Sequence, residues 1–229
     1  MPADLPAATM VLAVCAHPDD ESFGLGGILG AYVAAGTRAA VLCFTAGEAS
    51  TLGSGSADLA EVRARELAAA GAVLGIAHVE LLTYPDGALA TIPLIDLAAH
   101  VRRLAARFSA DLLLVFDEGG ITGHPDHCVA TEAALVAARE IDLSVLAWAM
   151  PKETADRLNR EFATHFVGRD DAELDMVINV DRVRQGQAIA CHESQAGQNP
   201  VLWRRLELLG EREWLRVLAA RRRQDASEG

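Results

Sequence analysis

Short apolar segments alternate with longer amphipathic segments along most of the chain, and this alternation restricts the possible folds more than any other feature. The apolar segments are short and β-compatible, as buried strands are. They are Met10–Ala16, Ala39–Thr45, Val79–Leu82, Leu112–Phe116 and Val145–Ala149. Segments between them, including Leu59–Leu74, Pro93–Phe108 and His127–Glu140, are long enough to cross back over a sheet. Because such strands are apolar on both faces, the pattern predicts a parallel sheet with helices on both sides.

After the fifth apolar segment the pattern changes. It predicts a charged helix over Lys152–Phe162, a strand over Asp175–Val180 and a helix over Asp181–His192, and it assigns no element type to a final segment, Trp203–Leu218. No linker, repeat or low-complexity segment interrupts the chain. We therefore expect residues 1–229 to form a single α/β domain. It would be Rossmann-like, with a mostly parallel central sheet, helices on both faces and a C-terminal extension.

The charge balance excludes several classes of partner. The chain has 20 Lys and Arg against 32 Asp and Glu, a net charge of −12. So acidic a protein repels phosphate backbones and anionic lipids, which predicts a small-molecule substrate and no nucleic-acid partner. No apolar stretch reaches the ~18 residues of a membrane-spanning helix, and the N-terminal segment lacks the basic flank of a signal peptide. We expect a cytoplasmic protein, and a homo-oligomer is compatible with this composition.

Histidine and aspartate residues collect in two clusters that follow apolar segments. Residues 17–20 (HPDD) come directly after the first segment, and residues 124–127 (HPDH) come shortly after the fourth. In a doubly wound sheet of strand order 3-2-1-4-5 the first and fourth strands are neighbours, and ligands bind at the carboxyl ends of the strands. We therefore expect both clusters to face one crevice.

These residue types at this spacing suit a metal ion. The first and last members of each cluster are three residues apart, so one helical turn directs both toward the same side. Imidazole and carboxylate ligands without thiolates suit Zn²⁺, with Fe²⁺ or Mn²⁺ as alternatives, and a catalytic site keeps three protein ligands. The residues predict a site made of His17, Asp20 and one of His124 and His127. Either cluster alone could be a turn or a helix N-cap.

The other polar residues of the clusters suit hydrolysis. Asp19, beside a ligand, could accept a proton from a water whose pKa the metal lowers toward ~7. The later histidine that does not bind metal could donate a hydrogen bond to a developing oxyanion. Asp126 could hold an imidazole in one tautomer. Together the clusters predict a hydrolytic metal site.

At these motifs the sequence closely resembles a known family, the LmbE-like (PIG-L) zinc-dependent N-deacetylases. The residues that carry the resemblance are 16–21 (AHPDDE) and 123–127 (GHPDH). Weaker similarities lie at residues 45–48, 65–66, 86–87 and 192–195. The resemblance thus extends from the first apolar segment to Gln195 and is weakest beyond it.

The resemblance implies roles for individual residues. It places zinc on His17, Asp20 and His127, general acid–base catalysis at Asp19 and transition-state stabilisation at His124. The choice between the two later histidines, which the spacing leaves open, comes from this resemblance.

It also implies an activity. Members of the family typically remove the N-acetyl group from an N-acetylglucosamine unit in a small molecule or glycoconjugate. Arg65 and Asp86 are candidates for binding sugar hydroxyls or an attached anionic group, and His192 could reach the site or simply cap a helix. The alternatives are a metal-dependent hydratase of an unsaturated carboxylic acid and a non-catalytic carbohydrate binder. The intact set of His and Asp residues argues against the binder.

Overall fold

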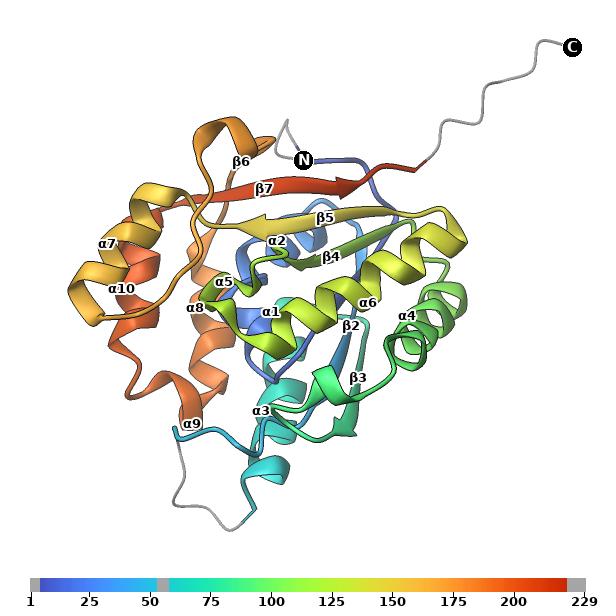
Figure 1. The fold of residues 1–229 in the computed structure, drawn as a ribbon, viewed down its shortest axis with the longest axis horizontal. Helices are drawn as coiled ribbons and strands as arrows, with labels where there is room; N and C mark the ends of the chain where they lie inside the picture. The colour runs from blue at the N-terminus through green and yellow to red at the C-terminus, as the bar shows by residue number, and fades with distance from the viewer. Residues whose placement is uncertain (1–4, 53–57, 222–229) are drawn as a thin grey trace, which may run out of the picture.

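The computed structural model describes residues 5–52 and 58–221, and this part of the chain forms one central sheet (Figure 1). From edge to edge its strands are β3 (His78–Tyr84), β2 (Arg38–Thr45), β1 (Met10–Cys15), β4 (Leu112–Phe116), β5 (Ser144–Ala149), β7 (Arg212–Ala219) and β6 (Met176–Asn179). The strands β3 to β5 in this order are parallel, which confirms the expected order 3-2-1-4-5. The strand β7 pairs antiparallel with both β5 and β6 and extends the sheet.

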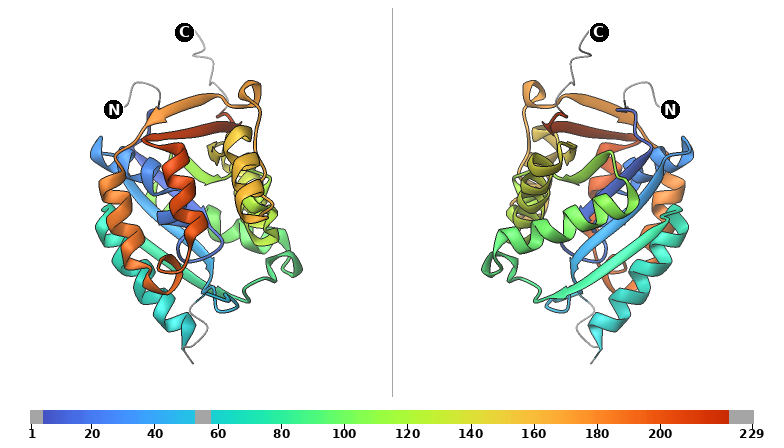
Figure 2. Two further views of the ribbon diagram at one scale, coloured as in Figure 1. Left: turned by 90° about the vertical axis from the view of Figure 1, so that its left-hand side faces the viewer. Right: turned by 90° about the vertical axis from the view of Figure 1, so that its right-hand side faces the viewer.

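Helices cover both faces of the sheet, as the sequence predicts (Figure 2). One layer contains α2 (Gly26–Ala34), α3 (Leu59–Leu74) and α8 (Arg182–Cys191), which contact one another. The other contains α4 (Leu94–Phe108) and α6 (Pro125–Ile141). Helices α7 (Lys152–Phe162) and α10 (Pro200–Leu209) pack together. The short elements are α1 (Asp20–Phe23), α5 (Gly120–Gly123), α9 (Glu193–Ala196), and the 3₁₀ turns η1 (Leu89–Thr91) and η2 (Asp171–Glu173).

The sheet separates the two main apolar clusters of the core, and β1 contributes to both. Val11, Ala13 and Cys15 pack in the cluster that contains α2 residues. The alternate residues Leu12 and Val14 pack in the cluster that contains residues of α4 and α6. Successive side chains of a strand point to opposite faces, so a strand between two helical layers is apolar throughout. This is why the apolar segments of the sequence show no alternation.

The C-terminal segment, for which the sequence pattern assigns no element type, divides into a helix and a strand. Residues 203–218 span most of α10 and of β7. Alternation along β7 is hidden because Glu213, a charged residue, is buried beside Leu215 on its inward face. The indole nitrogen of Trp148 donates to the Glu213 carboxylate at 2.6 Å. The strand therefore lacks an alternating apolar pattern because one inward position holds a charged residue, whose partner lies 65 positions away in the sequence.

The carboxylate of Asp117, just after β4, joins three segments that are far apart in the sequence. It accepts hydrogen bonds from Arg169 at 2.6 and 3.0 Å and from Arg216 of β7 at 2.6 Å. The backbone N–H of Gly119 donates to it at 3.0 Å. Burial raises the pKa of Asp117, but the hydrogen bonds from Arg169 and Arg216 outweigh burial and hold it below the ordinary value. This buried ion pair holds the end of β4 to the C-terminal part of the sheet.

The substitution Asp117→Asn is expected to lower the free energy of unfolding at pH 7 by up to about 3 kcal/mol, because it leaves Arg169 and Arg216 with only the more distant carboxylates of Glu173 and Glu118. A group whose pKa is depressed in the folded state stabilises the fold above its unfolded pKa, and this contribution falls away as pH drops through its folded pKa. The difference between wild type and variant should therefore shrink below about pH 4. Urea denaturation of wild type and variant at pH 7 and pH 3 measures the difference in the free energy of unfolding. A difference that is larger at pH 3 than at pH 7 would contradict a stabilising role of the Asp117 carboxylate.

None of the helices in the described ranges is both long and apolar enough to cross a membrane.

Candidate active site

The loops after β1 and β4 meet at one edge of the sheet because these two strands pair directly, with Leu12 opposite Leu113. The first loop carries His17 and leads into α1. The second leads into α6, where the His124 side chain accepts a hydrogen bond from the backbone of residue 126, and Pro125 occupies the first turn. Proline is well placed there because its missing N–H would have no partner in the helix. The HPDH sequence is therefore a helix start as well as a site motif.

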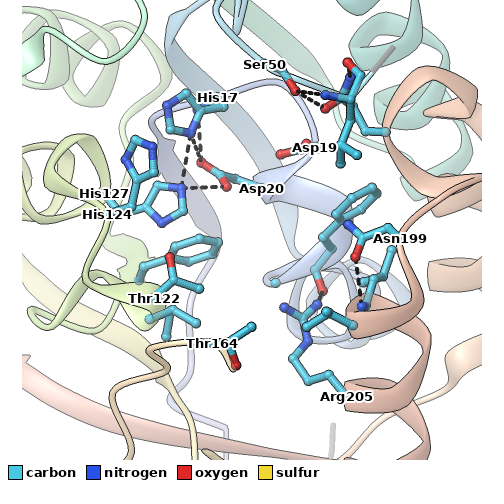
Figure 3. A pocket seen from close by; sticks show the side chains of 18 of the residues that line it. His17, Asp19, Asp20, Ser50, Thr122, His124, His127, Thr164, Asn199 and Arg205 are labelled. Atoms are coloured by element: carbon cyan, nitrogen blue, oxygen red, sulfur yellow. Dashed lines mark hydrogen bonds and ion pairs between the residues drawn. The ribbon is translucent and has the colours of Figure 1, made fainter. Parts of the chain in front are cut away.

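Three of the predicted ligand side chains lie together in a cavity of about 490 Å³ (Figure 3). Nδ1 of His17 is 3.1 Å from Nε2 of His127, and that Nε2 is 3.2 Å from Oδ1 of Asp20. The closest approach of Asp20 to the His17 ring is 3.9 Å, through Oδ2. Ligands about 2.0–2.1 Å from a tetrahedral zinc are roughly 3.3 Å apart. The pairs His17–His127 and His127–Asp20 have this spacing, and His17 and Asp20 are farther apart.

The second nitrogen of each histidine lies close to one or more oxygen atoms. Nε2 of His17 lies 3.1 Å from Oδ1 of Asp86 and 3.5 Å from Oδ2 of Asp126. Nδ1 of His127 lies 3.0 Å from the carbonyl oxygen of Gly120. The Gly120 carbonyl favours a proton on Nδ1 of His127 and leaves its Nε2 with a lone pair, as in histidines that bind metals. Nε2 of His17 is near two carboxylates but makes no hydrogen bond within the described part of the chain.

The carboxylate of Asp20 is oriented in the same way. Its Oδ2 accepts hydrogen bonds from the backbone N–H groups of Ala16 at 3.0 Å and His17 at 2.9 Å, so Oδ1 is the oxygen that faces His127. Burial raises the pKa of Asp20, but the neighbouring His127 more than offsets burial and the pKa falls below the ordinary value. The charged form that a metal would need is therefore the stable one.

His17 lies within 4.8 Å of two different sets of candidate ligands, one with His124 and His127 and the other with Asp86 and Asp126. His124 is the weaker ligand candidate, because its Nδ1 accepts a hydrogen bond from the backbone N–H of Asp126 at 3.2 Å. The neutral ring then carries its proton on Nε2, which makes that nitrogen a donor. Burial lowers the pKa of His124, as do the charges of His127 and His17, so the neutral form predominates.

Asp19 lies beside these groups in a backbone conformation that is unusual for a residue with a side chain, with φ of 133°. Its backbone N–H donates to Oε2 of Glu21 at 3.0 Å, and its carboxylate accepts from Arg63 at 2.8 Å. Burial raises the pKa of Asp19 to about 6, although the Arg63 charge acts in the opposite direction. A carboxyl group with a pKa near neutrality suits a general base.

The comparison with known families agrees with this geometry. The model of the GlcNAc-PI de-N-acetylase (PIG-L) family matches residues 12–138, more than half of the chain. The chain belongs to this family. The matched region contains both His/Asp clusters and the strands that bring them together.

Two curated relatives of this chain are deacetylases of an amino sugar. The 1D-myo-inositol 2-acetamido-2-deoxy-alpha-D-glucopyranoside deacetylase 1 of Catenulispora acidiphila is 35% identical over 162 residues, 60% of this chain and 50% of that protein. A deacetylase of the same substrate from Acidothermus cellulolyticus is 30% identical over 212 residues, 78% of this chain and 71% of that protein. The chain spans about half the length of the first curated relatives that it matches.

Solved structures share the fold of this PIG-L family member. A deacetylase of teicoplanin biosynthesis superposes with a TM-score of 0.69 at 21% identity, covering 91% of this chain and 98% of that one. The 4-carboxy-2-hydroxymuconate hydratase of Pseudomonas putida superposes with a TM-score of 0.70 at 17% identity, covering 93% and 98%. Because the fold is common to a deacetylase and a hydratase, the fold alone does not select between the two reactions.

Among the predicted substrate contacts, Asp86 lines the cavity but Arg65 does not. Arg65 is exposed on α3, whereas Arg63 is buried and lines the cavity. Two residues span about 200° of an α-helix, so these arginines point in nearly opposite directions. The spacing of apolar residues in the sequence could have indicated that Arg63 is buried, because Arg63 lies on the same face of α3 as Leu59 and Leu67.

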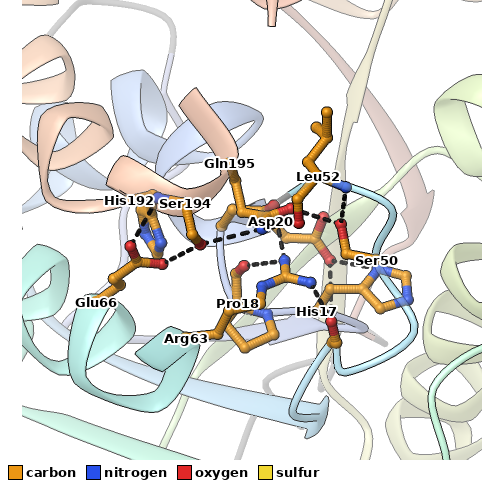
Figure 4. Close-up of polar contacts among 12 residues, drawn as sticks. His17, Pro18, Asp20, Ser50, Leu52, Arg63, Glu66, His192, Ser194 and Gln195 are labelled. Atoms are coloured by element: carbon orange, nitrogen blue, oxygen red, sulfur yellow. Dashed lines mark hydrogen bonds and ion pairs between the residues drawn. The ribbon is translucent and has the colours of Figure 1, made fainter. Parts of the chain in front are cut away.

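Arg63 joins the loops after β1 and β2 (Figure 4). Its guanidinium donates to the carbonyl oxygens of Pro18 and Gly47 as well as to the Asp19 carboxylate. On the same helix α3, the carboxylate of Glu66 accepts hydrogen bonds from Ser194 of α9. The Ser194 backbone N–H donates at 2.8 Å and its hydroxyl donates at 2.7 Å. These contacts place the C-terminal segment against the site.

Two further predicted site residues are buried behind the cavity and do not line it. His192 is fully buried at the end of α8, and its Nε2 lies 2.7 Å from Oε1 of Glu21, so it supports the residue that holds Asp19. Asp126 is also fully buried, and besides contacting His17 it accepts hydrogen bonds from the backbone of Gly87 at 2.8 Å and Leu89 at 3.1 Å. Neither residue is placed to touch a substrate. Oδ2 of Asp126 lies 3.5 Å from Nε2 of His17, and a catalytic role of Asp126 stays a prediction.

The protein is expected to bind one equivalent of Zn²⁺, measured by metal analysis after dialysis. Zinc at 100 times its Kd should raise the free energy of unfolding by about 2.7 kcal/mol. His127→Ala should abolish binding because it removes a ligand, whereas substitution of the exposed His165, which lies outside the cavity lining, should not. His124→Ala is expected to retain the metal, and its loss in that variant would show that His124 is a ligand.

The substitution Arg63→Gln is expected to lower the free energy of unfolding at pH 7.5 by about 3 kcal/mol, because it removes a buried guanidinium that bonds two backbone carbonyls and pairs with the partly buried Asp19 carboxylate. Arg65→Gln is the matched control on the same helix and should change it by less than about 0.5 kcal/mol. Urea denaturation of both variants measures the difference. Equal effects of the two substitutions would contradict the assignment of Arg63 to the site.

Proposed function

We propose that this protein is a metal-dependent hydrolase that removes the N-acetyl group from an N-acetylglucosamine-containing small molecule or glycoconjugate. The observation that carries the proposal is the convergence of His17, Asp20 and His127 beside the Asp19 carboxylate. The deacetylase relatives support the reaction and the amino-sugar substrate. The same relatives do not favour the hydratase alternative. Location in the cytoplasm and assembly into a homo-oligomer stay predictions of the sequence.

The ligand set of the proposed site consists of two imidazoles and one carboxylate. Zn²⁺ is the first choice for such ligands, and Fe²⁺ or Mn²⁺ are alternatives. A divalent ion there would act as a Lewis acid toward the acyl oxygen and lower the pKa of a water. The buried carboxylates of Asp86 and Asp126 raise the basicity of His17: burial lowers its pKa, but they outweigh burial and raise it to about 10. A metal would displace the proton that His17 holds at neutral pH, so binding would release this proton and strengthen as the pH rises.

The protein's own groups would perform the proton transfers of amide hydrolysis. The Asp19 carboxylate accepts a proton from water as the water oxygen attacks the acetyl carbon. Nε2–H of neutral His124 donates a hydrogen bond to the oxygen that becomes negatively charged. Asp19 then delivers that proton to the amide nitrogen as the C–N bond breaks, which gives a free amine and acetic acid, and the acid loses its remaining proton to solvent to become acetate. Arg63 keeps the Asp19 carboxylate in place during these steps.

The cavity provides room for a sugar beside these groups. Asp86 faces it from the loop after β3, and its Oδ2 is held by the backbone N–H of Ala49 at 2.9 Å. Trp148, Phe116 and Phe166 supply apolar walls on the side of β4 and β5. A mostly apolar lining with a few oriented polar groups is typical of a site for a small molecule.

Asp19→Asn is expected to reduce acetate release from N-acetylglucosamine conjugates by about 10²- to 10⁴-fold, because it removes the base while leaving the metal ligands in place. Acetate release by the zinc-loaded protein, with metal content measured in the same samples, tests this. Asp96→Asn, an exposed substitution on α4, is the control and should retain full activity.

Two outcomes would contradict the proposal. Full activity of the Asp19→Asn variant would exclude Asp19 as the base. Failure of the zinc-loaded wild type to release acetate from any conjugate would exclude the deacetylase reaction, and chelated protein provides the background rate.

A further inference from the structure

Arg205 of α10 is a cavity residue that none of the steps above uses. It lines the same cavity as the His17–His127 group but on the opposite side, beyond Asp19 (Figure 3). Its side chain is only 8% exposed. It lies outside residues 12–138, the region that the family model matches.

The guanidinium of Arg205 has few partners. One nitrogen, Nη2, donates to the carbonyl oxygen of Phe23 at 2.6 Å, and the central carbon lies 5.0 Å from the centre of the Trp148 ring. Its Nε is buried and has no hydrogen-bond partner among residues 5–52 and 58–221. A guanidinium carries five N–H donors, so most of the hydrogen-bond donors of Arg205 are not used by the described part of the protein.

No carboxylate in the described part of the chain forms an ion pair with Arg205. The buried carboxylate of Glu213 is engaged elsewhere: Arg182 donates to its Oε1 and the Trp148 indole donates to its Oε2. Across the cavity, the Asp19 carboxylate is paired with Arg63. This leaves two guanidinium groups, those of Arg182 and Arg205, around one carboxylate.

A buried charge without a counter-charge is costly, and proteins pair most buried charges. The aromatic face of Trp148 recovers part of this cost. Burial lowers the pKa of Arg205 to about 10, which still leaves the group charged at neutral pH. The nearby Glu213 carboxylate offsets part of the remaining cost, but it is hydrogen-bonded to Arg182 and is shared by two guanidinium groups. A cation kept on a cavity wall without an ion pair of its own is best explained by a counter-charge on the ligand.

We propose that Arg205 binds an anionic group, a carboxylate or a phosphate, on the part of the substrate attached to the amino sugar. This inference rests on the proposed function and narrows its substrate class. The acetamido group would lie at the His17–His127 side, and the anion would lie at the Arg205 side. In a protein with a net charge of −12, this local positive group allows an anionic substrate into the cavity.

Three glycosides of N-acetylglucosamine test the inference: the neutral methyl glycoside, the carboxymethyl glycoside and the 1-phosphate. The zinc-loaded wild type should prefer at least one of the anionic compounds over the methyl glycoside by at least about 10-fold in kcat/KM. The preferred compound shows whether a carboxylate or a phosphate is bound. A wild type that prefers neither would overturn the inference.

Arg205→Gln should lower kcat/KM for the preferred anionic compound by about 10- to 100-fold and leave the methyl glycoside nearly unchanged. Arg205→Lys, which keeps the charge but loses the planar fork, should show an intermediate preference. Arg204→Gln is the matched control on the same helix, since Arg204 pairs with Glu161 and Glu207 outside the cavity lining. An equal loss toward neutral and anionic compounds in Arg205→Gln would show a structural role only.

Binding to an Asp19→Asn protein separates this inference from the proposed function. Titration calorimetry of the anionic and methyl glycosides, with and without Arg205→Gln, reports recognition in the absence of turnover. A preference for the anion that depends on Arg205 would support the inference even if no acetate were released by the wild type. Absence of that preference, or of any binding, would overturn it even if the deacetylase activity were demonstrated.

Discussion

The parallel pairing of β1 with β4 is the constraint on which the site depends. The chain runs outward from β1 to β3 and then returns to place β4 on the other side of β1. The loops after β1 and β4 therefore open together at the carboxyl edge of the sheet, where sheets of this kind bind ligands. His17 and His127, 110 positions apart in the sequence, consequently lie 3.1 Å apart.

Concentrating charged groups at this edge requires that each have a partner. Asp20 and Asp126 each accept hydrogen bonds from two backbone N–H groups, and Asp19 is paired with Arg63. These contacts also select which oxygen or nitrogen faces the cavity, because an atom that already accepts a hydrogen bond is not available to a ligand. Arg205 is the contrasting case, a buried cation whose partner we assign to the substrate.

Much of the fold was predictable because its signals are local. Buried strands and their helices are visible as apolar runs and amphipathic periods, and the order of the parallel strands followed from the usual connections. The strand β7 was not visible, because Glu213 interrupts its alternation and is stabilised by a residue of β5. At the site, both clusters were evident, but Arg63 was missed in favour of Arg65 because the choice depends on which face of α3 meets the loops.

The sequence by itself determined the alternation of strands and helices, the two His/Asp motifs and the kind of metal that their side chains suit. These properties follow from residue types and from periods of two to four residues. Tertiary structure alone decided that Asp126 and His192 are buried behind the cavity, that Arg63 holds Asp19, and that Arg205 lies across from the metal ligands. Such decisions depend on the packing of segments distant in sequence, and the local backbone pattern carries no record of that packing.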